Sequence, residues 1–281
     1  MKPLFSLTLI SITVLLSATT FGQKVTEVKL NQGITLQMPK KTGDLNCGTR
    51  GACVTWNPLQ KKYYAAFAGN GAYPFAVFNA DGDRISSDTL ACQVDVRGLW
   101  FNPISKQVEG NGYNTIGWFR YQLDPKGDVK SFTILNDSLN QPDPQSVGAF
   151  DVKLKKIIFF FNNSVYFYSL NGKLNTDMNL PINLGITKAE NIKLEDNIDY
   201  NEVVGKYNVN AIVYTGLPGA EYGVLNAGDK AVELYDAKTG YLTKKLMLPV
   251  NASVEYSFNF AYANGMVWLF DMEHRAWIGY K

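Results

Sequence analysis

Histidine, cysteine and charge are all scarce in this 281-residue chain. It has one His and three Cys, and Asp, Glu, Lys and Arg make up 19% of it, against about 25% in ordinary soluble domains. So few nitrogen and sulfur ligands argue against a zinc site, and we expect no metal ion and no cofactor. Lys and Arg number 27 and Asp and Glu 25, so no charge excess predicts nucleic acid or an anionic membrane as a partner.

Long apolar runs are also missing, apart from one at the N-terminus. An apolar run over residues 4–16 follows Lys2, and small polar residues lead from it to Gly22. This order is typical of a cleaved secretory signal peptide, and the run is shorter than the ~20 apolar residues of a membrane span. We therefore expect residues 1–22 to be a signal peptide and residues 23–281 a single secreted or periplasmic domain without a membrane span. An uncleaved anchor helix is the alternative.

The rest of the chain contains an internal repeat. Trp56-Asn57-Pro58 and Phe101-Asn102-Pro103 stand 45 positions apart, and the turn glycines Gly82, Gly127 and Gly172 keep the same interval. Weaker copies follow over residues 150–172, 222–242 and 258–280. A period of about 40–50 residues is typical of the blades of a β-propeller.

Each unit has the composition of short strands joined by tight turns. Runs of β-branched and aromatic residues are separated by Asn-Gly, Asp-Gly or Thr-Gly, which supply the positive φ angles that hairpin turns need. No sustained helical period is present in the mature chain. The sequence therefore predicts an all-β fold, a propeller with four antiparallel strands in each blade. A β-sandwich is the structural alternative.

The number of blades and the closure of the ring need separate arguments. We expect five blades, with residues 183–210 as an insertion in the fourth; a degenerate sixth blade is the alternative. The fifth unit ends after three strands. We therefore expect an N-terminal strand, residues 24–30, to close the last blade as its outer strand, since an open edge would be exposed.

Residues 231–240, Ala-Val-Glu-Leu-Tyr-Asp-Ala-Lys-Thr-Gly, give the chain a family resemblance. It resembles secreted propellers with YVTN, NHL or quinoprotein-like blades over nearly all of the mature part. The resemblance implies the propeller fold and no particular catalytic residue. Quinoproteins place a docking Trp after the like motif, where this chain has Leu242, Thr243 and Lys244, so no quinone is implied.

The three cysteines are Cys47, Cys53 and Cys92, and an oxidising compartment would allow one disulfide among them. Cys47 stands nine residues before Trp56, and Cys92 stands nine before Phe101. Because these positions match in neighbouring repeats, we predict the pair Cys47–Cys92. A Cys47–Cys53 pair and no bridge at all are the alternatives.

The repeat register also predicts which loops share a face. Loops between blades emerge on the same side as loops between the second and third strands of each blade. That face gathers aromatic, amide and charged side chains suited to recognition, namely Arg50, Asn70, Tyr73, Asp95, Arg97, Asn111 and Tyr113. We expect these residues to bind a glycan, peptide or protein partner.

Enzymatic residues are harder to assign. The one imidazole, His274, lies in a predicted turn, and the Asn79–Asp83 segment reads as a turn rather than a calcium loop. Asp95, Asp151 and Asp199 are placed near the starts of predicted inner strands, where two carboxylates could cleave a glycosidic bond. We therefore predict a monomeric, non-catalytic recognition or scaffold propeller. The alternative is a glycosidase-like hydrolase or lyase that uses these acids.

Overall fold

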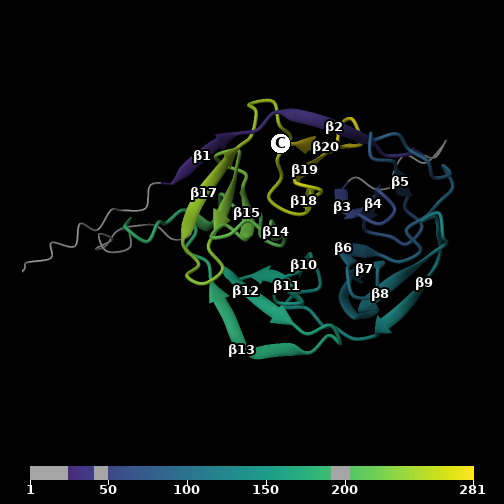
Figure 1. The fold of residues 1–281 in the computed structure, drawn as a ribbon, viewed down its shortest axis with the longest axis horizontal. Helices are drawn as coiled ribbons and strands as arrows, with labels where there is room; N and C mark the ends of the chain where they lie inside the picture. Colours follow the sequence, from purple (N-terminus) through teal and green to yellow (C-terminus); the bar gives the residue numbers. More distant parts are fainter. Residues whose placement is uncertain (1–24, 41–49, 191–202) are drawn as a thin grey trace, which may run out of the picture.

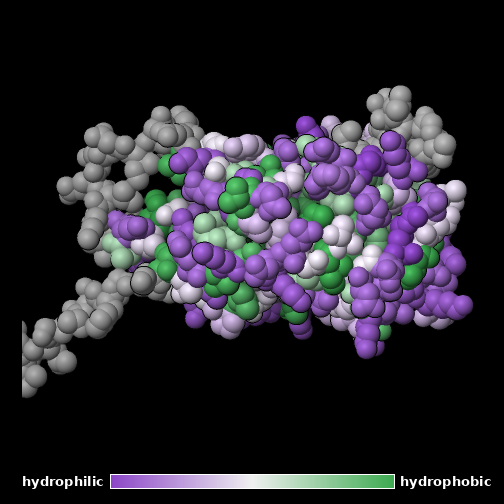
Figure 2. All heavy atoms as spheres, turned by 90° about the horizontal axis from the view of Figure 1, so that it is seen from above, coloured by the Kyte–Doolittle hydropathy of each residue, from purple (hydrophilic) through white to green (hydrophobic). Residues whose placement is uncertain are grey.

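The computed structural model describes residues 25–40, 50–190 and 203–281, and these form a five-bladed β-propeller (Figure 1). The predicted all-β fold and the five blades are confirmed. Seen from its rim, the molecule presents mostly hydrophilic side chains with apolar ones scattered among them (Figure 2). Within the described residues, no helix has the length and apolar character needed to cross a membrane.

The strands follow the chain blade by blade, from the innermost strand outward. Blade 1 has β3 (Arg50–Asn57), β4 (Lys62–Ala68) and β5 (Phe75–Phe78); blade 2 has β6 (Val96–Asn102), β7 (Gln107–Gly112), the short 3-10 helix η1 (Asn114–Ile116), β8 (Trp118–Leu123) and β9 (Val129–Asn136); blade 3 has β10 (Ala149–Asp151), β11 (Lys156–Phe161), β12 (Ser164–Tyr168) and β13 (Leu174–Pro181). Blade 4 has β14 (Val213–Tyr214), β15 (Tyr222–Asn226), β16 (Ala231–Tyr235) and β17 (Leu242–Met247), and blade 5 has β18 (Phe260–Ala263), β19 (Met266–Asp271) and β20 (Ala276–Tyr280). In blade 1, only isolated bridges at Arg84 and Ala91 occupy the place of a fourth strand.

Neighbouring blades pack through aromatic side chains. The rings of Phe67 in blade 1 and Phe270 in blade 5 meet edge to face with centroids 5.4 Å apart, and those of Phe75 and Tyr121 join blades 1 and 2 at 4.8 Å. Gly51 fits between blades 1 and 5 because a Cβ atom there would lie 2.4 Å from the ring of Trp277. The blades therefore bury both faces only by stacking around the axis.

The N-terminal segment closes the ring, but the strand that closes it is not the predicted one. β2 (Gln32–Gln37) pairs antiparallel with β20 and completes blade 5. β1 (Thr26–Lys29), in the segment assigned this role from sequence, instead adds a parallel fifth strand outside β17 of blade 4. The two strands occupy adjacent blade edges (Figure 1), so the alternating pattern of residues 24–30 was not sufficient to distinguish them.

The inserted segment after β13 packs against blade 4. Tyr207 bridges to Asn226 of β15, and Asn183 bridges to Tyr241 just before β17. The described part of residues 183–210 is therefore an insertion rather than a sixth blade.

Two of the cysteines, Cys53 and Cys92, lie within the described part of the chain, and no disulfide joins them. Cys53 and Cys92 are both buried, and the Cys92 thiol donates to the carbonyl oxygen of Pro74 at 3.3 Å. Cys47, the other half of the predicted pair, lies outside the described residues, so the pairing stays a prediction.

Candidate functional site

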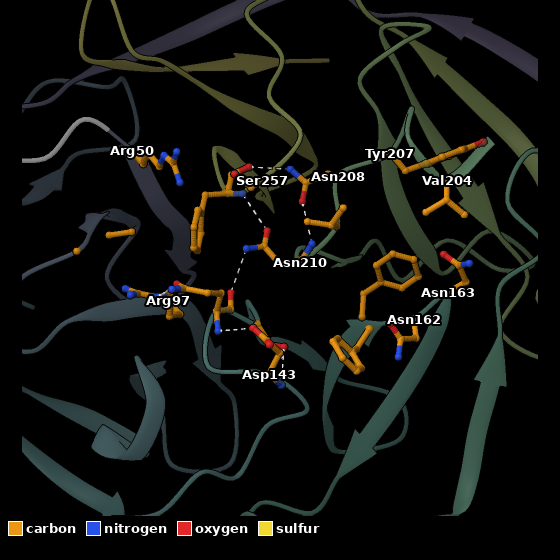
Figure 3. A pocket seen from close by; sticks show the side chains of 18 residues that line it. Arg50, Arg97, Asp143, Asn162, Asn163, Val204, Tyr207, Asn208, Asn210 and Ser257 are labelled. Carbon is orange, nitrogen blue, oxygen red and sulfur yellow. Dashed lines mark hydrogen bonds between the residues drawn. The ribbon is translucent and has the colours of Figure 1, made fainter. Parts of the chain in front are cut away.

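The propeller axis opens into one cavity at each end. Inner strands β3 and β6 begin at Arg50 and near Arg97 beside one cavity, and end near Trp56 and Phe101 beside the other. The first cavity has a volume of about 880 Å³, and we call it the arginine cavity (Figure 3). It is lined by Arg50, Ala68, Gly69, Arg97, Asp143, Gln145, Ser146, Phe160–Asn163, Val204, Tyr207–Asn210, Ser257 and Phe258.

Arg97 is a structural member of this wall. Its guanidinium forms a bidentate ion pair with Asp95 and donates from Nε to Gln145 Oε1 at 2.7 Å. The central carbon of the guanidinium also lies 4.7 Å from the ring centre of Tyr113 and 5.5 Å from that of Phe258. Only 4% of Arg97 is exposed, so its charge and donors are already used within the protein.

Arg50, at the start of β3, lies at the register position that Asp95 takes in blade 2, 45 residues later. Its side chain is exposed, and its guanidinium has no hydrogen-bond or ion-pair partner among the described residues. Asp95 stands two residues before Arg97, whereas Gly48 stands two residues before Arg50. Asp95 therefore provides a counter-ion for Arg97, whereas no acid stands at the corresponding distance before Arg50. Arg50 extends into the arginine cavity (Figure 3).

The amides on the blade 4 side hold loops in place. Asn208 donates to the carbonyl oxygens of Glu255 and Phe258, both at 3.0 Å, and accepts from Ala211 N at 3.1 Å. Asn210 accepts from Phe258 N at 2.9 Å and donates to Gln145 O at 3.2 Å. These bonds tie the insertion to the loops before β18 and β10, so they fix the shape of the cavity.

A smaller group of polar side chains remains available to a ligand. Asp143 accepts from Gln145 N through Oδ1 at 2.8 Å, while its Oδ2 has no partner among the described residues. Exposed Asn162 sits in the β11–β12 turn with a φ of 45°, and half-buried Ser257 lies on the loop before β18. Half-buried Phe161 adds an apolar surface. Among the described residues, the lining thus offers one unpaired cation, one carboxylate and neutral donors.

The other predicted binding residues have different surroundings. Exposed Asn70 lines a neighbouring groove with Asp95, and its Oδ1 accepts from Ala72 N at 2.8 Å. Tyr73 is half-buried beneath the same loop, and Tyr113, 37% exposed, covers Arg97. The structure places none of these three side chains in the lining of the arginine cavity.

Asn111 was expected on a loop but is fully buried in β7. Its amide donates to Gln141 Oε1 at 2.7 Å and to Ser146 O at 2.8 Å, and its Oδ1 accepts from Gly148 N at 3.0 Å. Both of its donors and one acceptor site therefore join blades 2 and 3, and with no exposed surface it presents no group to a ligand.

The three predicted acids do not converge. Asp95 is paired with Arg97. Asp151 is at the end of β10 rather than at its start, where it is buried and accepts a 2.7 Å hydrogen bond from the Tyr222 hydroxyl. Asp199 lies outside the described residues. His274 is exposed in the β19–β20 turn, and its imidazole forms a 2.9 Å hydrogen bond with Asp271 of the same turn.

No cluster of three His, Cys, Asp or Glu side chains suited to a metal ion occurs within the described ranges. The sequence argument found Arg50 and Arg97 but missed most of the wall. Asp143, Asn162, Asn208, Asn210 and Ser257 lie in connections of irregular length, where the repeat gives no register. The one available signal was the concentration of Asn in residues 201–210.

No protein-family model matches the sequence, and no curated protein matches it. Among solved structures, a glutaminyl cyclase from Myxococcus xanthus is similar with a TM-score of 0.55 at 7% identity, over 92% of this chain and 98% of that one. A protein of unknown function from Bacteroides thetaiotaomicron gives a TM-score of 0.46 at 12% identity, over 81% of this chain and 58% of that one. The glutaminyl cyclase likeness shows that the two chains share the propeller fold.

Proposed function

We propose that this protein is a non-catalytic recognition propeller that binds a short peptide with free termini in the arginine cavity. The observation that carries the proposal is the guanidinium of Arg50, which has no ion-pair partner among the described residues, while the charge of Arg97 in the same cavity is neutralised by Asp95. A guanidinium binds a carboxylate through two parallel hydrogen bonds. Arg50 is therefore assigned to the C-terminal carboxylate of the peptide.

Asp143 supplies the opposite charge on another wall of the cavity (Figure 3). Its unpartnered Oδ2 is suited to an ammonium group, and we assign it to the peptide N-terminus. Asn162 and Ser257 can bond the peptide groups between the termini, while Phe161 offers apolar contact. A ligand with both charges fits this arrangement better than a neutral glycan, which would leave Arg50 and Asp143 without ionic partners.

The hydrolase alternative has less support. Hydrolysis of a glycosidic bond uses two carboxyl groups roughly 5–10 Å apart, and Asp143 is the one carboxylate among the described residues that line this cavity. The Myxococcus xanthus cyclase shares 7% of its residues with this chain, so its activity is not extended to it.

Isothermal titration with tetra-alanine tests the proposal. We expect binding of the peptide with free termini, at least tenfold weaker binding of its C-terminal amide, and the same loss for Arg50→Ala with the free peptide. N-acetylation of the peptide and the Asp143→Asn substitution should likewise weaken binding to the same extent. Equal binding by both variants and the wild type would refute the assignment. Binding of tetragalacturonate in preference to all peptides would identify a glycan carboxylate as the ligand instead, and chemical turnover of either probe would favour the hydrolase.

A further inference from the structure

The opposite end of the axis carries a second cavity, of about 630 Å³, which we call the aromatic cavity. Half-buried aromatic side chains from the inner strands of four different blades line it: Trp56, Phe101, Tyr214 and Tyr262. They lie at or near the ends of β3, β6, β14 and β18. Lys153 is the one charged side chain among the described residues of the lining.

Exposed aliphatic residues surround this cavity. The turns that follow the inner strands of four blades present Leu59 (60% exposed), Ile104 (56%), Val152 (54%), Leu154 (40%) and Leu217 (39%). Turns favour Gly, Asn, Asp, Ser and Pro for conformational reasons. Turn conformation therefore does not explain the aliphatic residues at these positions. An exposed apolar patch of this kind marks an interaction site.

The backbone holds these aliphatic residues in fixed positions. In blade 1, the buried Asn57 accepts a hydrogen bond from Leu59 N at 3.0 Å, and in blade 2 Asn102 accepts one from Ile104 N at 2.9 Å. In blade 3, Asp151 accepts from Leu154 N at 2.8 Å. Because the turns are already ordered, binding a partner here costs little conformational entropy.

The same turns are basic. Their exposed charged residues are Lys61, Lys106, Lys153 and Lys155, and none of these ammonium groups has an ion-pair partner among the described residues. In a chain with a net charge of +2, four lysines around one apolar cavity form a local concentration of positive charge. Such a surface attracts an anionic partner and discriminates against a cationic one.

We propose that this surface, the aromatic cavity with its surrounding turns, binds a protein partner through an acidic segment that inserts an apolar side chain into the cavity. Aromatic residues at the centre of a recessed apolar site, with charge at its edge, are the composition of interaction hot spots. The recess favours a projecting protein segment over a flat lipid surface. This surface lies at the end of the axis opposite Arg50, so the proposal does not depend on peptide binding there.

Selection of a phage-displayed dodecapeptide library on the wild-type protein tests this inference. We expect enriched peptides with Asp or Glu flanking an aromatic or aliphatic residue. Synthetic copies should bind at least tenfold more weakly to Leu59→Ser/Ile104→Ser and to Lys106→Glu/Lys153→Glu, and salt should weaken wild-type binding. Val250→Ser is the matched control because Val250 is 90% exposed, and its carbonyl accepts from Lys230 in the β15–β16 turn, at the other end of the axis.

The inference fails if no peptide is enriched, if the enriched peptides lack acidic residues, or if they bind both double variants as well as the wild type. Sedimentation with phosphatidylglycerol vesicles provides the other arm. Wild-type sedimentation that both double variants lose would assign the surface to an anionic membrane instead. Circular dichroism on each variant separates loss of binding from loss of folding, and Arg50→Ala should leave binding of these peptides unchanged.

Discussion

The hydroxyl of Tyr207 donates a 2.7 Å hydrogen bond to Oε2 of Glu233, a carboxylate with no exposed surface. Tyr235 donates to the same oxygen at 2.6 Å, and Lys245 pairs with Oε1 at 3.1 Å. Burial raises the pKa of both phenols above their usual value, so each remains a protonated donor. Because Tyr207 belongs to the insertion, these bonds attach one wall of the arginine cavity to blade 4.

Replacing Tyr207 by Phe should therefore weaken both the fold and the cavity. Loss of a hydrogen bond to a buried carboxylate costs about 1.5–3 kcal/mol. Because the insertion is then held less firmly, the Tyr207→Phe variant should bind tetra-alanine less tightly. Urea unfolding and titration calorimetry measure the two effects. Tyr256→Phe is the control because Tyr256 is 51% exposed; equal stability of the two variants would contradict the structural role of Tyr207.

Arg50 and Arg97 should respond differently to substitution by Ala. Arg97→Ala removes a guanidinium with a 5% exposed side chain from its pair with Asp95, which should cost about 3–5 kcal/mol, as breaking a buried ion pair does. Arg50→Ala should leave the free energy of unfolding within about 0.5 kcal/mol of wild type, as is usual for exposed sites. Denaturant unfolding of both variants checks this contrast, and a large loss for Arg50→Ala would show that Arg50 has a structural role.

The buried thiols should be inert in the native protein. Burial raises the pKa of Cys53 to about 11 and that of Cys92 to about 12, and the thiolate is the reactive form. A thiol-disulfide indicator at pH 8 should therefore detect at most one thiol per native chain. In denaturant without reductant, three thiols would show that no bridge exists, whereas one would agree with a Cys47–Cys92 pair.

The His274 imidazole should titrate above its ordinary range. Its hydrogen bond and charge interaction with Asp271 raise its pKa above 6.5. Their contribution to stability is therefore present below about pH 6.5, the unfolded-state value, and disappears as the pH rises through the folded-state pKa. As the single His in the chain, it gives one imidazole proton signal by NMR. Asp271→Asn should lower the titration midpoint towards 6.5, and an unchanged midpoint would contradict the pairing.

Two truncations separate the roles of the N-terminal strands. Deleting residues 23–37 removes β2 with its fully buried Leu36 and exposes the edge of β20, so this chain should unfold or aggregate. Deleting residues 23–30 removes β1 and leaves the β2–β20 pairing in place. It should fold with a smaller fall in melting temperature. Size-exclusion chromatography and thermal unfolding compare the two truncated chains. An equal fall in melting temperature for both would contradict closure by β2 alone.

The repeat made the fold predictable. Trp56-Asn57-Pro58 and Phe101-Asn102-Pro103 lie at equivalent strand ends of neighbouring blades, because each blade packs against its neighbours in the same way. The same register predicts that Asp151 ends an inner strand, since Phe150-Asp151 matches Trp56-Asn57. Reading Asp151 as a strand start was therefore an error of register.

The candidate site was less predictable for a physical reason. Side chains that line the arginine cavity lie on connections whose lengths differ from blade to blade, and only the tertiary structure brings Asp143 near the blade that carries Arg50. Strand pairing between segments far apart in the sequence was equally unpredictable. Nothing local in residues 24–37 indicates that β1 takes a parallel partner while β2 takes an antiparallel one.

Pairing of Gln32 with Tyr280 also sets the order of events during synthesis. The ring cannot close until β20 has left the ribosome, so the backbone groups of β2 remain unpaired while the intervening blades form. Contacts of such high sequence separation slow folding, and open strand edges are the parts of a folding intermediate that aggregate. The unpaired edge of β2 is therefore the part of the folding intermediate that a chaperone would protect from aggregation until β20 is available.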